Sequence, residues 1–91
     1  MAITVQLPSV LRAYCPGASK FSLEATSVRA ALEQIERHHP ALYRCICDET
    51  GAVRRHVNVF VNDSHIGACN GFDTVLVSGD VITIMPAVSG G

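Results

Sequence analysis

The 91-residue sequence lacks the surplus of positive charge that nucleic-acid-binding domains usually carry. The chain has seven Lys and Arg residues and eight Asp and Glu residues, which gives a formal net charge of -1. RNA and DNA are therefore not expected as partners. No apolar run approaches the roughly 20 residues that span a membrane, and no charged leader precedes an apolar stretch at the N-terminus. We expect a soluble, cytoplasmic protein.

Recognisable catalytic patterns are also missing. The sequence shows no nucleophile with an obvious base, no paired carboxylates and no glycine-rich phosphate loop. A chain of 91 residues leaves no room for a catalytic domain beside a substrate-binding one. Hydrophobic residues make up 48% of it and charged residues only 16%, so it can bury one small core. We expect a single folded domain that is not an enzyme.

Cysteine is present, but not in a metal-binding pattern. The four positions are Cys15, Cys45, Cys47 and Cys69. Only Cys45 and Cys47 are close, whereas a plant-type ferredoxin needs a tight C-x4-C-x2-C run. His38 and His39 with this C-x-C pair do not have the spacing of a zinc site. No basic neighbour marks Cys69 as a persulfide carrier. We interpret all four as free thiols and expect no bound metal or cofactor.

The first half of the chain predicts two strands and a helix. Apolar residues alternate over residues 3–7 and again over residues 21–25, with Pro8 and a turn region between them. Ser27 can cap a helix that Pro40 limits at its far end. Its apolar stripe consists of Val28, Ala31, Leu32 and Ile35.

The second half predicts mostly strands. The structure of residues 43–55 is left open, because a short apolar patch there runs into turn-forming residues. Residues 57–61 alternate most clearly, and residues 64–68 favour a short strand. Turns follow at residues 70–71 and 78–80, before a last strand at residues 81–85 whose Ile82 and Ile84 face the core. Residues 87–91 are small and end in two glycines, which predicts a mobile, exposed tail.

These elements fit one arrangement of the α+β class. Placing the first strand beside the last, with the helix crossing one face, satisfies the right-handed crossover rule. The result is a β-grasp: a mixed four- to five-stranded sheet with one main helix. Residues 1–86 form this domain, and residues 87–91 form the tail.

The strand order, the turn Ser78-Gly79-Asp80 and the ending Met85-Pro86-Ala87-Val88-Ser89-Gly90-Gly91 together resemble the MoaD/ThiS family of ubiquitin-like sulfur carriers. The resemblance covers essentially the whole chain, including residues 7–12 and 53–62. Two terminal glycines alone are a weak signal, because flexible tails often contain them. Residues 43–55 are most similar to members that serve cysteine or molybdopterin synthesis.

The resemblance implies a function for the tail. An E1-like partner enzyme, an adenylyltransferase and sulfurtransferase, would use ATP to adenylate the carboxylate of Gly91, and sulfur would then displace AMP. The resulting thiocarboxylate would donate sulfur to a cysteine synthase-like enzyme or to the large subunit of molybdopterin synthase. Val88, Ser89 and Gly90 would thread into the partner's active site, where a Cβ at the glycines would restrict the chain. The carrier itself would bind no cofactor.

Two questions stay open at this point. Phe60 and Met85 are expected on the sheet face opposite the helix, where they would form a partner-docking patch unless residues 43–55 fold over Phe60. The chain could also be a ubiquitin-like modifier joined through Gly91 to lysines of target proteins. A third interpretation is a plain β-grasp binding module.

Overall fold

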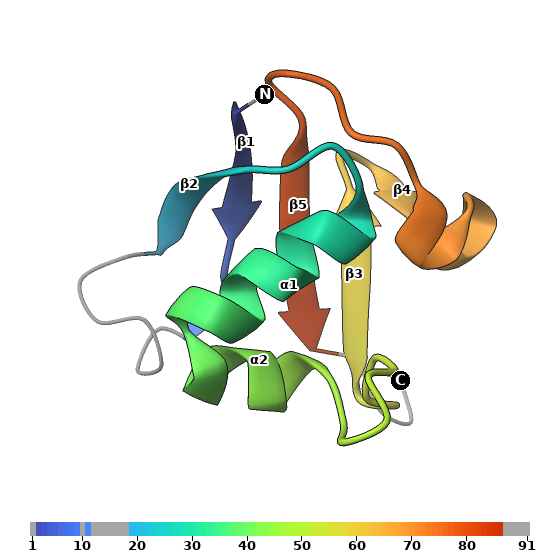
Figure 1. Ribbon diagram of the computed structural model, residues 1–91. Helices are drawn as coiled ribbons and strands as arrows, with labels where there is room; N and C mark the ends of the chain where they lie inside the picture. Colours follow the sequence, from blue (N-terminus) through green and yellow to red (C-terminus); the bar gives the residue numbers. More distant parts are fainter. Residues whose placement is uncertain (1, 10, 12–18, 87–91) are drawn as a thin grey trace.

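The computed structural model describes residues 2–9, 11 and 19–86, which form a mixed sheet with two helices on one face (Figure 1). The elements in chain order are β1 (Ala2–Gln6), β2 (Lys20–Glu24), α1 (Val28–His38), α2 (Pro40–Ile46), β3 (Val57–Val61), β4 (Ser64–His65), η2 (Ile66–Ala68), η3 (Gly71–Asp73) and β5 (Val81–Pro86). None of the helices in these ranges is long and apolar enough to cross a membrane.

The sheet has five strands in the order β2-β1-β5-β3-β4. β1 and β5 run parallel, whereas the β1–β2, β3–β5 and β3–β4 pairs are antiparallel. The predicted pairing of the first strand with the last is therefore confirmed, and so is the β-grasp arrangement.

The alternating pattern of the strands places one side chain in two on the helix-covered face. In β5, Ile82 and Ile84 are buried, and Met85 is exposed. In β3 the three valines are buried, while Asn58 and Phe60 are only partly so. β1 contributes Ile3 and Val5 to the same core.

Helix α1 begins and packs as the sequence predicts. The Ser27 side chain accepts a hydrogen bond from the Ala30 amide at 3.1 Å, so the cap satisfies one of the free donors of the first turn. Its buried residues are Val28, Ala31, Leu32 and Ile35, which is the predicted stripe.

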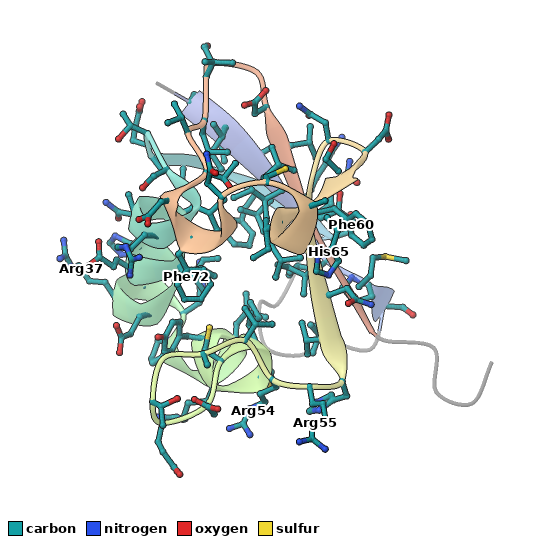
Figure 2. All side chains as sticks on the ribbon, turned by 90° about the vertical axis from the view of Figure 1, so that its right-hand side faces the viewer. Arg37, Arg54, Arg55, Phe60, His65 and Phe72 are labelled. Carbon is teal, nitrogen blue, oxygen red and sulfur yellow. The ribbon has the colours of Figure 1, made fainter. Side chains whose placement is uncertain are left out.

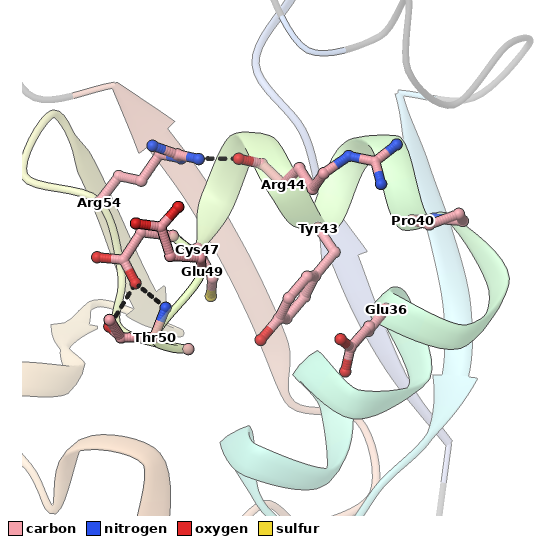
Figure 3. A pocket seen from close by; sticks show the side chains of 10 residues that line it. Glu36, Pro40, Tyr43, Arg44, Cys47, Glu49, Thr50 and Arg54 are labelled. Atoms are coloured by element: carbon pink, nitrogen blue, oxygen red, sulfur yellow. Dashed lines mark hydrogen bonds between the residues drawn. The ribbon is translucent and has the colours of Figure 1, made fainter.

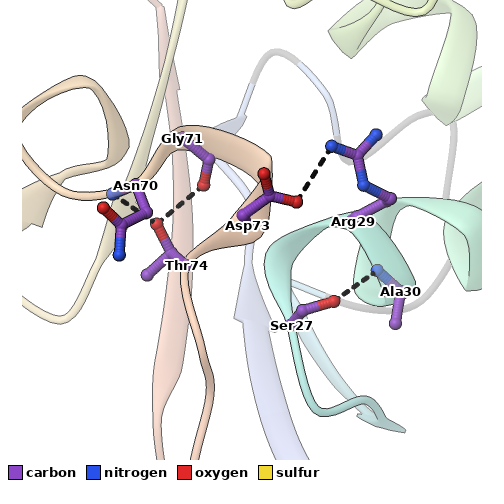
Figure 4. A network of polar contacts seen from close by, with 7 residues as sticks. All are labelled: Ser27, Arg29, Ala30, Asn70, Gly71, Asp73 and Thr74. Atoms are coloured by element: carbon purple, nitrogen blue, oxygen red, sulfur yellow. Dashed lines mark hydrogen bonds and ion pairs between the residues drawn. The ribbon is translucent and has the colours of Figure 1, made fainter.

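The short helix η3 packs beside the start of α1 (Figure 4). Arg29 forms an ion pair with Asp73 at 3.1 Å, and its guanidinium lies 5.6 Å from the centre of the Phe72 ring. Thr74 donates to the Gly71 carbonyl and closes the turn. Both members of the ion pair are mostly exposed, so it orients η3 more than it stabilises the fold.

Helix α2 lies in the region that the sequence left partly open. Pro40 both limits α1 and occupies the first turn of α2, where its missing N–H costs nothing. Leu42 and Ile46 are fully buried and belong to the core cluster, and α2 itself lies below α1 in Figure 1. The β-grasp core of this chain thus includes a second helix beside the one main helix that was predicted.

The predicted short strand at residues 64–68 is only partly correct. β4 ends at His65, and Ile66 starts the 3-10 helix η2. The His65 side chain accepts a hydrogen bond from the Gly67 amide at 2.9 Å, which caps this turn, and Ile66 is buried. The strand thus ends at His65, where the chain turns into η2 and Ile66 enters the core.

Candidate functional site

The residues predicted to carry the chemistry, Val88, Ser89, Gly90 and Gly91, lie outside the described residues. What the structure places is the point where this tail leaves the sheet. β5 runs through the middle of the sheet and ends at Pro86, whose backbone partner is Val57 at the start of β3. The tail therefore begins beside the turn at residues 54–56.

That turn is built by backbone hydrogen bonds and carries two arginines. The Val57 amide donates to the Arg54 carbonyl at 3.0 Å, and the Arg54 amide donates to the Ile46 carbonyl at 2.9 Å. Figure 2 shows Arg54 and Arg55 together beyond the lower end of β3. Arg54 and Arg55 are the only two adjacent arginines in the sequence. They thus flank the start of the tail.

The other end of β5 is fixed by Asp80, the last residue of the turn that contributed to the family resemblance. Its carboxylate accepts hydrogen bonds from the Val77 amide at 2.9 Å and from the Asn62 side chain at 3.1 Å. Asn62 has a positive φ of 54° and its side-chain oxygen accepts from the Val81 amide. Gly79 supplies the turn's own positive φ of 90°. This motif is therefore structural: it sets where β5 starts.

The same contacts perturb the Asp80 carboxyl. Its pKa is lowered, first because the Val77 N–H stabilises the charged form and then because the Asn62 amide does the same. Asp80 is accordingly ionised at neutral pH, the form in which its carboxylate accepts both hydrogen bonds.

Phe60 and Met85 lie on the sheet face opposite the helices, as predicted. In the β3–β5 register Phe60 pairs with Thr83 and Asn58 pairs with Met85, so all four side chains share that face. Met85 is 44% exposed, whereas Phe60 is partly buried. Residues 43–55 pack on the helix side and at the lower end of the sheet (Figure 1), so they do not fold over Phe60. Whether this face docks a partner stays a prediction.

His65 supports Phe60 on this face, a contact that sequence reasoning did not identify. The two rings meet edge to face, with centroids 5.3 Å apart. Because Nδ1 of His65 accepts from the Gly67 amide, we assign the ring hydrogen to Nε2, which lies 3.1 Å from the Asn58 side-chain oxygen. The signal available in the sequence was the Asn62-Asp63 turn, which folds β4 back onto β3.

A hollow of about 450 Å³ lies between α1, α2 and the loop that follows α2 (Figure 3). Tyr43 and Cys47 form part of its wall, and acidic and basic side chains mix around it. Asp48 holds the loop by accepting from the Thr50 and Ala52 amides at 2.8 and 3.2 Å. Charges of both signs partly cancel at this rim, so the hollow does not select one kind of ion.

The thiol in this wall is not activated. Burial raises the pKa of the Cys47 thiol above its usual value, which keeps it protonated at neutral pH. Burial also raises the pKa of Tyr43, and so does the adjacent Cys47. Cys45, Cys47 and Cys69 are free thiols, and Cys15 lies outside the described residues. Within residues 2–9, 11 and 19–86, no three His, Cys, Asp or Glu side chains are grouped to hold a metal ion.

Comparison with known proteins gives consistent matches over the whole chain. Residues 6–91 match the ThiS family. The sulfur carrier protein CysO of Mycobacterium tuberculosis is 31% identical over 93 aligned residues that cover 100% of both chains. The crystal structure of M. tuberculosis CysO superposes with a TM-score of 0.86 at 30% identity, over 94% of this chain and 99% of that one.

Two further structures extend the comparison. A chain of the Amycolatopsis orientalis BexX/CysO complex has a TM-score of 0.82 at 30% identity and covers 98% of this chain and 99% of its own. The small archaeal modifier protein 1 of Methanosarcina acetivorans has a TM-score of 0.83 at 29% identity, with 99% and 96% coverage. The match to the family continues to the last residue, Gly91.

Proposed function

The chain belongs to the ThiS family, and from this premise we propose that it is a sulfur carrier whose terminal Gly91 carboxylate is converted to a thiocarboxylate. The observation that carries the proposal is the extent of the match to CysO. It covers all of both chains, so the alignment includes the folded body and reaches the C-terminal end of each. A carrier of this kind is a substrate of its partner enzymes and not itself a catalyst.

The conversion needs activation, because a carboxylate is a poor electrophile. In the proposed sequence the Gly91 carboxylate attacks the α-phosphate of ATP on an E1-like enzyme, and pyrophosphate leaves. Sulfide then attacks the acyl carbon, AMP leaves, and loss of the S–H proton gives a thiocarboxylate. The thiocarboxylate is ionised at neutral pH and is a softer nucleophile than the carboxylate, which suits sulfur transfer to an acceptor enzyme.

The length of chain that follows β5 is compatible with both steps. Residues 87–91 follow the central strand β5 and span at most about 17 Å when extended. This length lets the terminus enter a cleft while the folded body stays outside. Gly90 and Gly91 lack a Cβ, so the chain end can approach catalytic groups closely.

The acceptor is the finer part of the proposal. Similarity to CysO favours an enzyme of cysteine synthesis, with the large subunit of molybdopterin synthase as the other acceptor of the same chemistry. A CysO chain is also found in a complex with BexX, which supports assembly of such carriers with a separate partner protein.

The test is the mass of the intact protein after incubation with the activating enzyme of the same organism, ATP and a sulfide source. We expect one oxygen atom to be exchanged for one sulfur atom, and fragment ions to place the change on Gly91. An unchanged mass would refute the carrier function. Adducts to lysines of other proteins, without sulfur exchange, would instead support a modifier, the role printed in the name of the M. acetivorans relative.

The outer face of the sheet is the proposed docking surface for these partners. Met85 is exposed one residue before the end of β5, from which the tail departs, and Phe60 lies on the same face opposite Thr83, nearer the middle of that strand. We expect Phe60→Ala to weaken binding of the activating enzyme more than it lowers the melting temperature, as measured by titration calorimetry and thermal unfolding. Val75→Ala, at a residue 71% exposed, is the matched control. A large loss of stability with unchanged binding would show that Phe60 is only structural.

A further inference from the structure

The arginines of the described chain differ in how the fold uses them. Arg29 pairs with Asp73. Arg37 and Arg44 occupy the last turns of α1 and α2, where a positive charge is favourable near the helix C-terminus. Arg54 donates from Nε to the Arg44 carbonyl at 2.7 Å (Figure 3). Each of these four side chains has a contact or a helix end that accounts for it.

No contact or helix end of this kind accounts for Arg55. Its side chain is exposed, and it makes no ion pair or hydrogen bond with any residue of the described ranges. Its neighbour Arg54, by contrast, is held by the fold through the hydrogen bond from its Nε to the Arg44 carbonyl. Arg55 is therefore an unneutralised positive charge on a chain whose net charge is -1. A cation that the fold does not use is available for a partner.

The position of Arg55 limits what that partner group can be. Arg55 lies two residues before Val57, and Val57 pairs with Pro86. Arg55 therefore flanks the base of the tail (Figure 2). An extended tail carries the Gly91 carboxylate up to about 17 Å away from this point. When the tail enters a cleft in this extended form, the Arg55 guanidinium stays away from a nucleotide that reacts at the terminus. It lies where the entrance of a cleft would surround the base of the tail.

The charges of the carrier also define the direction in which its tail enters the enzyme. The tail bears a negative carboxylate at its tip, and Arg55 places a positive charge at its base. An enzyme that brings this carboxylate to ATP must hold two anionic groups together, so its interior has to be positive. An acidic entrance would attract Arg55 and admit the tail in the productive direction.

We propose that Arg55 binds an acidic surface at the entrance of the cleft in which the activating enzyme receives the tail. This inference rests on the proposed function, since it assumes that such an enzyme takes the tail into a cleft. It adds the chemistry of the surface that the enzyme presents to the folded body.

The experiment compares Arg55→Glu with Arg37→Glu, two exposed positions at which the same charge is reversed. Figure 2 shows Arg37 on α1, well away from Arg55. Binding of each variant to the activating enzyme is measured without ATP, at about 0.05 M and about 0.5 M salt. At low salt we expect Arg55→Glu to raise Kd about tenfold and Arg37→Glu to change it less than about twofold. High salt should remove most of the difference.

A second measurement separates this inference from the proposed function. In the ATP–pyrophosphate exchange reaction, Arg55→Glu should raise KM for the carrier while kcat stays within about twofold, because the reacting terminus is unaltered. Equal effects of the two substitutions on Kd would overturn the role of Arg55, even if the wild-type carrier is adenylated. Arg55-dependent binding without adenylation would leave this contact in place and refute the carrier function. Failure of the wild-type chain to bind would overturn both.

Discussion

Adding one alanine after Gly91 is expected to abolish adenylation, with a loss of at least about 100-fold in the rate of AMP transfer. The extension moves the reacting carboxylate by about 3.5 Å and places a Cβ in the cleft, and misplacement by about 1 Å already costs rates of this order. Pyrophosphate exchange and intact mass both report the result. Gly90→Val should act in the same direction, because its side chain restricts φ and widens the tail.

The matched control for this prediction is one alanine added before Met1. It changes the length and mass equally but leaves the terminal carboxylate where it was. Both extended chains should unfold at the wild-type temperature, because the core side chains of β5 are Ile82 and Ile84, ahead of the tail. Normal AMP transfer to the C-terminally extended chain would contradict the role assigned to Gly91.

Leu42→Ala is expected to lower the free energy of unfolding by about 2–5 kcal/mol, the usual cost of a cavity left by a buried leucine. Leu42 is fully buried on α2 and belongs to the core cluster. For a domain of this size, each kcal/mol shifts the melting temperature by about 4–8 °C, so the expected decrease is roughly 8–40 °C. Urea and thermal unfolding measure it directly.

The comparison for Leu42→Ala is Val75→Ala, which truncates a side chain that is 71% exposed. This change should cost less than about 0.5 kcal/mol. If both substitutions cost the same, α2 does not form part of the hydrophobic core. The pair therefore tests α2, a helix that the periodicity of the sequence did not identify.

The sequence predicted well those elements whose evidence is local. The stripe of α1 and the cap at Ser27 depend on residues within a few positions of each other, and both are confirmed. The alternation of Val57, Val59 and Val61 likewise determines a strand and the face that it buries. The structure of residues 43–55 could not be predicted in this way, because α2 has only seven residues and is stabilised by burial of Leu42 and Ile46.

The same distinction between local and tertiary evidence applies to the residues of the candidate site. The terminal glycines, with the lead-in from Met85, are contiguous in the sequence, so the hypothesis of an activated C-terminus needed no coordinates. The support of Phe60 by His65 depends on the β3–β4 pairing. The position of Arg55 at the base of the tail depends on the pairing of Val57 with Pro86.

By itself, then, the sequence determined the strands with clear alternation and the first helix, and its family resemblance led to the chemistry proposed for the chain end. The tertiary structure alone decided that α2 completes the core, that Asp80 clamps the start of β5 through Asn62, and that Arg55 flanks the tail. The physical reason is the range of the interactions. Periodicity and capping act between neighbours in the chain. The contacts of Asn62 with Asp80 and of Val57 with Pro86 join residues 18 and 29 positions apart, and they exist only once the sheet has formed.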